Sequence, residues 1–104
     1  MEFIDFHTHV YPDAIAPKAA DSIRVFYGFG ETAMDGTVNT LLRRGDVAGT
    51  RRFVILPVAM RPENTRHIND FILHTLEGNS RLFGFGTVHA AMENIVDEAD
   101  YLLN

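Results

Sequence analysis

The amino-acid sequence predicts an α/β fold built on a parallel sheet, and three observations support this prediction. Short apolar segments alternate with longer segments in which apolar residues recur at helical spacing. The run Phe53–Val58 is continuously apolar, as expected of a strand that is buried on both faces in a parallel sheet. Glycine and proline residues separate these segments. Strands joined by helices pair in parallel through right-handed crossovers.

The first strand is predicted over residues 2–7, a short segment rich in aromatic and β-branched residues. A helix is predicted to begin near Pro12 and to end at Gly28, and a loop of glycine and small polar residues follows over 28–36. Four apolar residues recur at helical spacing within that helix: Ile15, Ala19, Ile23 and Phe26.

The second helix is predicted to be capped by Thr37 and to end at Gly49, although Gly45 weakens its helical pattern. The second strand covers 53–58, with Pro57 at its end because a central proline removes a hydrogen-bond donor.

A third helix is predicted after Pro62 and ends at Gly78, because Ile68, Phe71, Ile72, Thr75 and Leu76 share one face. The third strand is predicted over 82–88, and a last helix from Ile95 runs into the C-terminus.

Length and composition limit the classes of function. The 104 residues form one predicted domain, 1–104, and the balance of 46% hydrophobic and 22% charged residues is that of a soluble globular protein. The net charge of −5 and the scattered basic residues argue against a nucleic-acid partner. No apolar run approaches the ~20 residues that span a bilayer, so we expect no membrane partner and a cytoplasmic location. The absence of cysteine excludes disulfides and thiolate metal sites.

The segment His7-Thr8-His9 is the strongest candidate for chemistry. Residues i and i+2 of an extended chain point to the same side, so both imidazoles can converge on one cation where the first strand ends. Asp5 lies two residues earlier and points the same way, so it is expected either to orient one of the histidines through a hydrogen bond or simply to hydrogen-bond inside the mouth of a barrel. The alternative is a pair of ordinary histidines that form local hydrogen bonds.

The segment 4–12, with its pattern Asp5-x-His7-x-His9 followed by a proline, resembles the first-strand motif of the amidohydrolase superfamily. It is most similar to the amidohydrolase-2 branch, which includes enzymes like aminocarboxymuconate-semialdehyde decarboxylase. Looser similarity extends over the whole chain, although only the first residues are specific.

This resemblance implies a TIM (β/α)8 barrel with a divalent metal at its C-terminal face, and zinc is the metal expected first. His7 and His9 match the metal-binding histidines of the first strand. The implied activity is that of a metal-dependent hydrolase that attacks a C–N or C–O bond with metal-activated water, or a related decarboxylation of a small carboxylate. TatD-type nucleases and PHP-type phosphoesterases share the histidine pair but fit less well, because Tyr11 stands where the former carry an acid and the latter continue with Ser-Asp-Gly.

Two further residues are candidates for lining a substrate pocket. His89 is expected at the end of the third strand, at the same edge as the histidine pair. Arg61, just beyond the second strand, is suited to bind an anionic substrate group. Each also has an ordinary interpretation, a local hydrogen bond for His89 and a solvated loop position for Arg61.

The chain is short for the architecture that it resembles. A barrel of this kind needs ~250 residues, and 104 supply about three β/α units of an incomplete barrel. The first hypothesis is therefore an N-terminal fragment of a metal-dependent hydrolase that is inactive alone. The second is a non-catalytic binding or assembly module derived from the barrel. In both we expect self-association or a complementing chain, because an open parallel sheet leaves edges and apolar faces uncovered.

Overall fold

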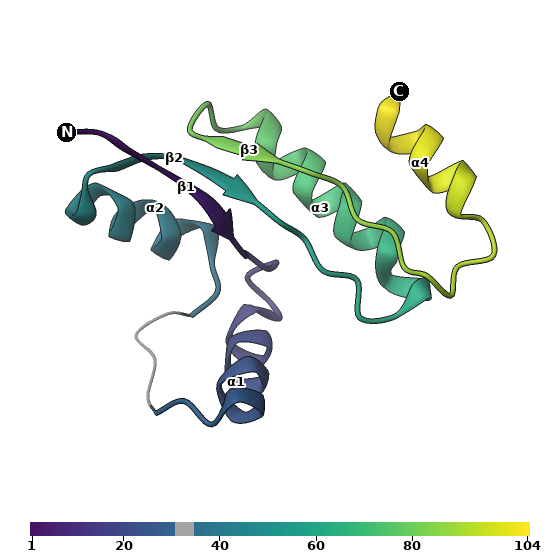
Figure 1. Ribbon diagram of the computed structural model, residues 1–104, viewed down its shortest axis with the longest axis horizontal. Helices are drawn as coiled ribbons and strands as arrows, with labels where there is room; N and C mark the ends of the chain where they lie inside the picture. The colour runs from purple at the N-terminus through teal and green to yellow at the C-terminus, as the bar shows by residue number, and fades with distance from the viewer. Residues whose placement is uncertain (31–34) are drawn as a thin grey trace.

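The computed structural model describes residues 1–30 and 35–104, and its centre is a three-stranded parallel sheet in the order β1-β2-β3 (Figure 1). The strands are β1 (Phe3–Thr8), β2 (Thr50–Ile55) and β3 (Leu82–Gly84). The helices are α1 (Ala16–Tyr27), α2 (Val38–Ala48), α3 (Thr65–Glu77) and α4 (Ile95–Leu103), with a 3₁₀ turn η1 (Pro62–Asn64) before α3. The predicted α/β alternation and parallel pairing are confirmed in this open sheet, while closure into a barrel stays a prediction.

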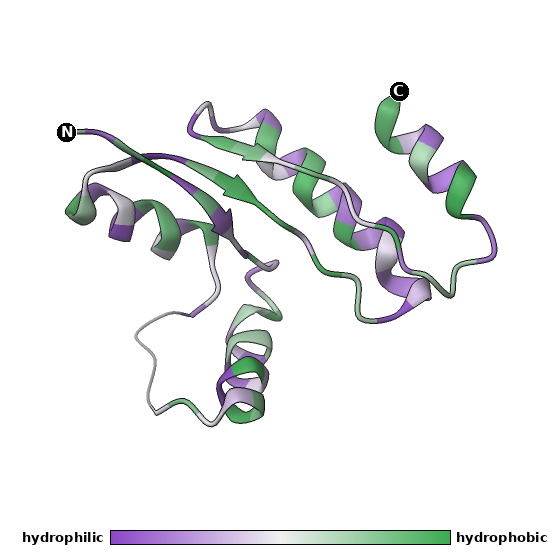
Figure 2. Cartoon of the chain, in the orientation of Figure 1, coloured by the Kyte–Doolittle hydropathy of each residue, from purple (hydrophilic) through white to green (hydrophobic). Residues whose placement is uncertain are grey.

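The hydrophobic core lies between the sheet and two helices, α2 and α3. Phe53, Ile55 and Leu82 from the strands meet Leu41 of α2 and Ile72 of α3, and each of the five is less than a tenth exposed. Figure 2 shows why these elements pack, because β2 is apolar along its second half and α3 alternates apolar and polar patches. Full burial of each such side chain stabilises the fold by roughly 1.5–3 kcal/mol.

Helix α2 matches its prediction closely. The hydroxyl of Thr37 accepts a hydrogen bond from the backbone N–H of Thr40 at 3.2 Å, and Gly49 ends the helix in the left-handed region at φ 78°. Gly45 does not interrupt the helix. A Cβ atom there would lie 2.2 Å from the ring of Phe53, so the glycine lets α2 approach the sheet closely.

Helix α4 is attached to α3 by a buried carboxylate. Glu98 is 1% exposed, and it accepts hydrogen bonds from Nε of Arg66 at 2.8 Å and from Nδ2 of Asn69 at 2.7 Å. Asn69, itself buried, also pairs with both backbone groups of Thr87. The network therefore joins α3, α4 and the segment after β3, with every polar atom of the Glu98 carboxylate satisfied.

The third strand is shorter than predicted, because β3 ends at Gly84 instead of 88. Its partner β2 runs from Thr50 to Ile55, earlier than the predicted 53–58, and Pro57 has no N–H to continue a ladder. Beyond β3 the chain turns toward α4, where a Cβ atom on Gly86 would lie 2.3 Å from Leu102.

Helix α1 has the predicted boundary at Gly28, but its predicted apolar face is not covered. Only Ala16 of this helix is buried, whereas Phe26 is 81% exposed, and Figure 1 shows α1 standing away from the sheet. The predicted loop over 28–36 lies partly outside the described residues. In the described part of the chain, every helix is too short or too polar to cross a bilayer.

Candidate metal site

The two histidines predicted to bind a metal lie together at the end of β1. His7 belongs to the strand and His9 follows it, and their Nε2 atoms are 3.1 Å apart. The rings meet edge to face, with centroids 5.0 Å apart. Both residues are exposed, so solvent and small ions reach the pair. The nitrogen separation is the central geometric fact of the site.

A backbone carbonyl determines which nitrogen of His9 is free. Nδ1 of His9 lies 2.6 Å from the carbonyl oxygen of Leu56, in the segment after β2. Because a carbonyl oxygen only accepts, Nδ1 carries the proton and the neutral ring presents a lone pair at Nε2. That lone pair faces His7 and is available to a ligand, or to a proton donated by the His7 ring. The sequence carried no signal for this contact, since a backbone carbonyl has no residue signature.

Thr8 anchors the segment between the two histidines. Its hydroxyl is buried and donates to the carbonyl of Val54 at 2.9 Å, while its own carbonyl accepts from the N–H of Leu56 at 2.8 Å. These contacts tie the end of β1 to β2 and hold the backbone on both sides of the rings. The sheet therefore holds the backbone of His7 and His9 in place.

Asp5 contacts the backbone of the same segment. Its Oδ1 atom accepts a hydrogen bond from the backbone N–H of His7 at 3.0 Å. The role of Asp5 in orienting a histidine ring stays a prediction. The carboxylate is exposed.

The two candidates for a substrate pocket occupy different surroundings. His89 lies five residues beyond β3 in a turn, where its Nδ1 accepts from the backbone N–H of Ala91 at 3.0 Å. This contact is the ordinary local hydrogen bond considered for it. Arg61 precedes η1 with an exposed side chain, and its carbonyl accepts from the N–H of Asn64. Their roles in substrate binding stay predictions.

A cavity of about 250 Å³ lies directly beside His9, and sequence reasoning did not find it. Tyr11, Ile23, Arg24, Phe29 and Leu41 are among its lining residues. The phenol of Tyr11 is protonated at neutral pH and can donate a hydrogen bond, and burial raises its pKa further above the ordinary value. The cavity lies between the segment after β1, helix α1 and the start of α2, and no local sequence pattern reveals such a convergence.

Within residues 1–30 and 35–104, no group of three or more histidine, aspartate, glutamate or cysteine side chains is arranged to hold a metal ion. Comparison of the chain with protein-family models, curated proteins and solved structures finds no match. The fold and the histidine geometry are therefore the observations from which a function is argued.

Proposed function

We propose that this chain provides two metal ligands, His7 and His9, of an amidohydrolase-type metal-dependent hydrolase. The observation that carries the proposal is the 3.1 Å separation of the two Nε2 atoms at the carboxyl end of β1. Ligands at the carboxyl ends of parallel strands are typical of α/β enzymes. The Asp-x-His-x-His pattern of the sequence supports the same assignment.

The donor set fits a divalent transition metal. Two nitrogens bound at ~2.0–2.1 Å to one tetrahedral ion lie ~3.3–3.4 Å apart, close to the separation of the His7 and His9 nitrogens. The Leu56 carbonyl keeps the proton of His9 on Nδ1, the arrangement that metal-binding histidines share. Zinc is the first choice, although imidazole also suits iron, nickel and copper. The same separation is a hydrogen bond between the two rings when no ion is bound.

When bound, such a metal supplies a water whose pKa falls toward ~7 and a Lewis acid for a carbonyl or carboxylate. His7 and His9 would bind the ion, and the contacts of Thr8 with β2 would keep both rings oriented. A catalytic zinc site takes three protein ligands, so this pair needs at least one more ligand to catalyse. We therefore expect the 104-residue chain to be inactive alone.

The cavity beside His9 is suited to a small organic substrate. Its walls combine apolar side chains, such as Ile23 and Phe29, with the protonated phenol of Tyr11. Arg24 also lines it, and its guanidinium already donates two hydrogen bonds to Asp21 at 2.8 and 2.6 Å. The proposed reaction is hydrolysis of a C–N or C–O bond, or decarboxylation of a small carboxylate.

Zinc titration of the metal-free chain tests the proposal, with affinity measured by isothermal calorimetry. His7→Ala and His9→Ala should each weaken zinc binding at least about tenfold, because each removes one of two ligands. His74→Ala is the matched control, since this exposed histidine of α3 lies outside the pair and should leave affinity unchanged. Undiminished zinc binding by both His7→Ala and His9→Ala would refute the assignment.

A non-catalytic assembly module is the second candidate, and one observation favours it. The sheet and the residue that follows β3 expose large apolar side chains, including Phe6 at 70% and Phe85 at 64%. Surfaces of this kind mark sites of association. A chain that associates but does not bind zinc through His7 and His9 would support this candidate over the enzyme.

A further inference from the structure

Part of the uncovered apolar face of α1 borders the cavity beside His9. Ala20 and Ile23 of this helix line the cavity, and so does Leu41 of α2, which is itself buried in the core. The cavity has a volume of about 250 Å³, whereas a cavity of ~150 Å³ is enough to bind benzene. It therefore has room for a substituted six-membered ring or a branched alkyl group of similar size.

The positive charge at the cavity is already compensated. Arg24 is the one arginine or lysine among the described residues that line it. Its guanidinium donates two hydrogen bonds to the carboxylate of Asp21, from Nε at 2.8 Å and from Nη2 at 2.6 Å. Both residues belong to α1 and lie three positions apart, so this ion pair forms within the helix and needs no ligand to complete it.

A negative charge lies next to two other lining residues. Thr37 and Thr40 line the cavity, and their hydroxyls donate to the carboxylate of Asp35 at 2.8 and 3.0 Å. Each of these hydroxyls has therefore used its one proton. The hydrogen bonds from Thr37 lower the pKa of Asp35, so its carboxylate is ionised at neutral pH. An anionic group in the cavity would lose its hydration close to this charge without gaining a partner that compensates for it.

Tyr11 supplies a hydrogen-bond donor to the cavity. Its backbone N–H donates to the carbonyl of Gly36 at 2.9 Å, and a Cβ atom on Gly36 would lie 3.1 Å from Cδ2 of the Tyr11 ring. These contacts hold the ring in place at the wall. In the part of the chain that the structure describes, no residue forms a hydrogen bond with the phenol, and burial is the cause of its shifted pKa. The phenol proton is therefore available to an acceptor atom of a ligand.

We propose that the cavity binds an uncharged apolar group of the substrate, an alkyl or aryl group with one carbonyl or ether oxygen that accepts a hydrogen bond from Tyr11. Tyr11 is then a specificity-determining residue. The assignment of this ligand as the substrate rests on the proposed function, because His9 belongs both to the cavity and to the candidate metal site. The preference for an uncharged group rests on the cavity alone.

Acetophenone and benzoate test the proposal on the full chain, kept free of metal with EDTA. The two probes have the same ring and nearly the same size, but only benzoate is charged. Titration followed by two-dimensional NMR should show millimolar binding of acetophenone, with shifts centred on Ile23 and Leu41, and a Kd for benzoate that is at least ~10-fold higher. Benzoate binding as tight as that of acetophenone would overturn the proposal, and so would the absence of acetophenone binding.

Tyr11→Phe isolates the contribution of the phenol, and Tyr27→Phe is the matched control. Tyr27 is 63% exposed and is not among the residues that line the cavity. Loss of one hydrogen bond should raise the acetophenone Kd ~2- to 10-fold in Tyr11→Phe, whereas Tyr27→Phe should leave it unchanged. The same Kd in both variants would contradict the role assigned to Tyr11.

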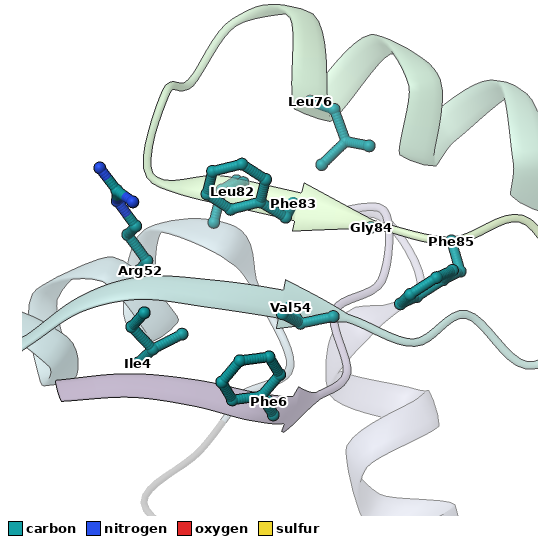
Figure 3. A pocket seen from close by; sticks show the side chains of 9 residues that line it. All are labelled: Ile4, Phe6, Arg52, Val54, Leu76, Leu82, Phe83, Gly84 and Phe85. Carbon is teal, nitrogen blue, oxygen red and sulfur yellow. The ribbon is translucent and has the colours of Figure 1, made fainter.

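The exposed face of the sheet offers the probes a competing site. A groove of about 570 Å³ is bordered there by Phe6, Phe83 and Phe85 (Figure 3). Shifts centred on these rings instead of Ile23 would refute the cavity assignment. Zinc titration reports on the metal site separately. A chain that binds zinc through the histidine pair but does not bind acetophenone refutes the cavity assignment alone, whereas one that binds acetophenone at Ile23 but no zinc refutes the metal site alone.

Discussion

Gly45 lies in the middle of α2, where its missing side chain makes room for the ring of Phe53. Replacement by alanine improves intrinsic helix propensity by about 1 kcal/mol. It also places a methyl group 2.2 Å from a ring atom of Phe53, so helix or ring must shift. Overpacking of this kind typically costs about 1–3 kcal/mol, and we expect Gly45→Ala to destabilise the protein in urea unfolding.

Gly78→Ala is the control for this experiment. Gly78 follows α3 at φ −88°, and the nearest atom to its added Cβ is the carbonyl oxygen of Thr75 at 4.0 Å. Alanine fits there, so stability should be unchanged or slightly higher. If Gly45→Ala proved as stable as Gly78→Ala, the close approach of α2 to the sheet would be wrong.

Asp35 shapes the start of α2 through its carboxylate. The backbone N–H of Thr37 donates to it at 3.0 Å, and the hydroxyls of Thr37 and Thr40 donate at 2.8 and 3.0 Å. The Thr37 backbone hydrogen bond, followed by that of its hydroxyl, lowers the pKa of Asp35 below 3.8. A carboxylate whose pKa is lower in the folded state than in the unfolded state stabilises the fold above pH ~3.8. This stabilisation is lost as the pH falls through the pKa of the folded state.

We therefore expect Asp35→Asn to destabilise the chain at pH 6, with the difference from the unaltered chain shrinking below pH ~3.8. Thermal unfolding across this pH range measures it. Asp13→Asn removes a charge at an exposed position outside the cap and should show a smaller effect. An Asp35→Asn penalty that stayed constant down to pH 2 would contradict the assigned role.

At the scale of elements, α4 depends on the network around Glu98. Glu98→Gln keeps the shape of the side chain but removes the negative charge that Arg66 contacts at 2.8 Å. An imperfectly satisfied buried polar group costs about 1–3 kcal/mol, so we expect a loss of this size in chemical unfolding. Amide hydrogen exchange should also accelerate in α4 more than in α2.

Glu93→Gln provides the comparison for α4, because Glu93 is exposed and lies before the helix. This variant removes the same charge without touching Arg66 or Asn69. Equal stability of Glu93→Gln and Glu98→Gln would mean that the buried carboxylate does not hold the helix.

For the whole molecule, stability should be distributed unevenly. β2 lies between two strands and carries core residues such as Ile55, which is 0% exposed. α1 buries only Ala16 and stands away from the sheet. Native-state hydrogen exchange should therefore find the slowest amides in β2 and fast exchange in α1, because local opening follows buried contacts. Protection of α1 equal to that of β2 would show that another surface covers this helix.

The spacing of the apolar residues and the positions of glycine and proline were sufficient to predict the order of the elements and whether each is a helix or a strand. Thr37 and Gly49 predicted both ends of α2, since caps act within a few residues of each other. The extent of β3 was not predictable in this way. The length of β3 depends on where its partner β2 ends and on how closely Leu102 approaches Gly86. Both of these contacts involve segments that are distant along the chain.

The meeting of two imidazoles at the end of a strand is predictable from the residues alone, because the alternation of side chains in an extended chain is a local property. The tautomer of His9 is not predictable in this way, because it is set by the carbonyl oxygen of Leu56, which is 47 residues away along the chain. Tertiary packing likewise creates the cavity beside His9, the close contact of Gly45 with Phe53, and the exposure of Phe6 and Phe85. These four features share one cause. Hydrogen bonds and packing between distant segments depend on how the elements meet, whereas pattern and propensity describe each element alone.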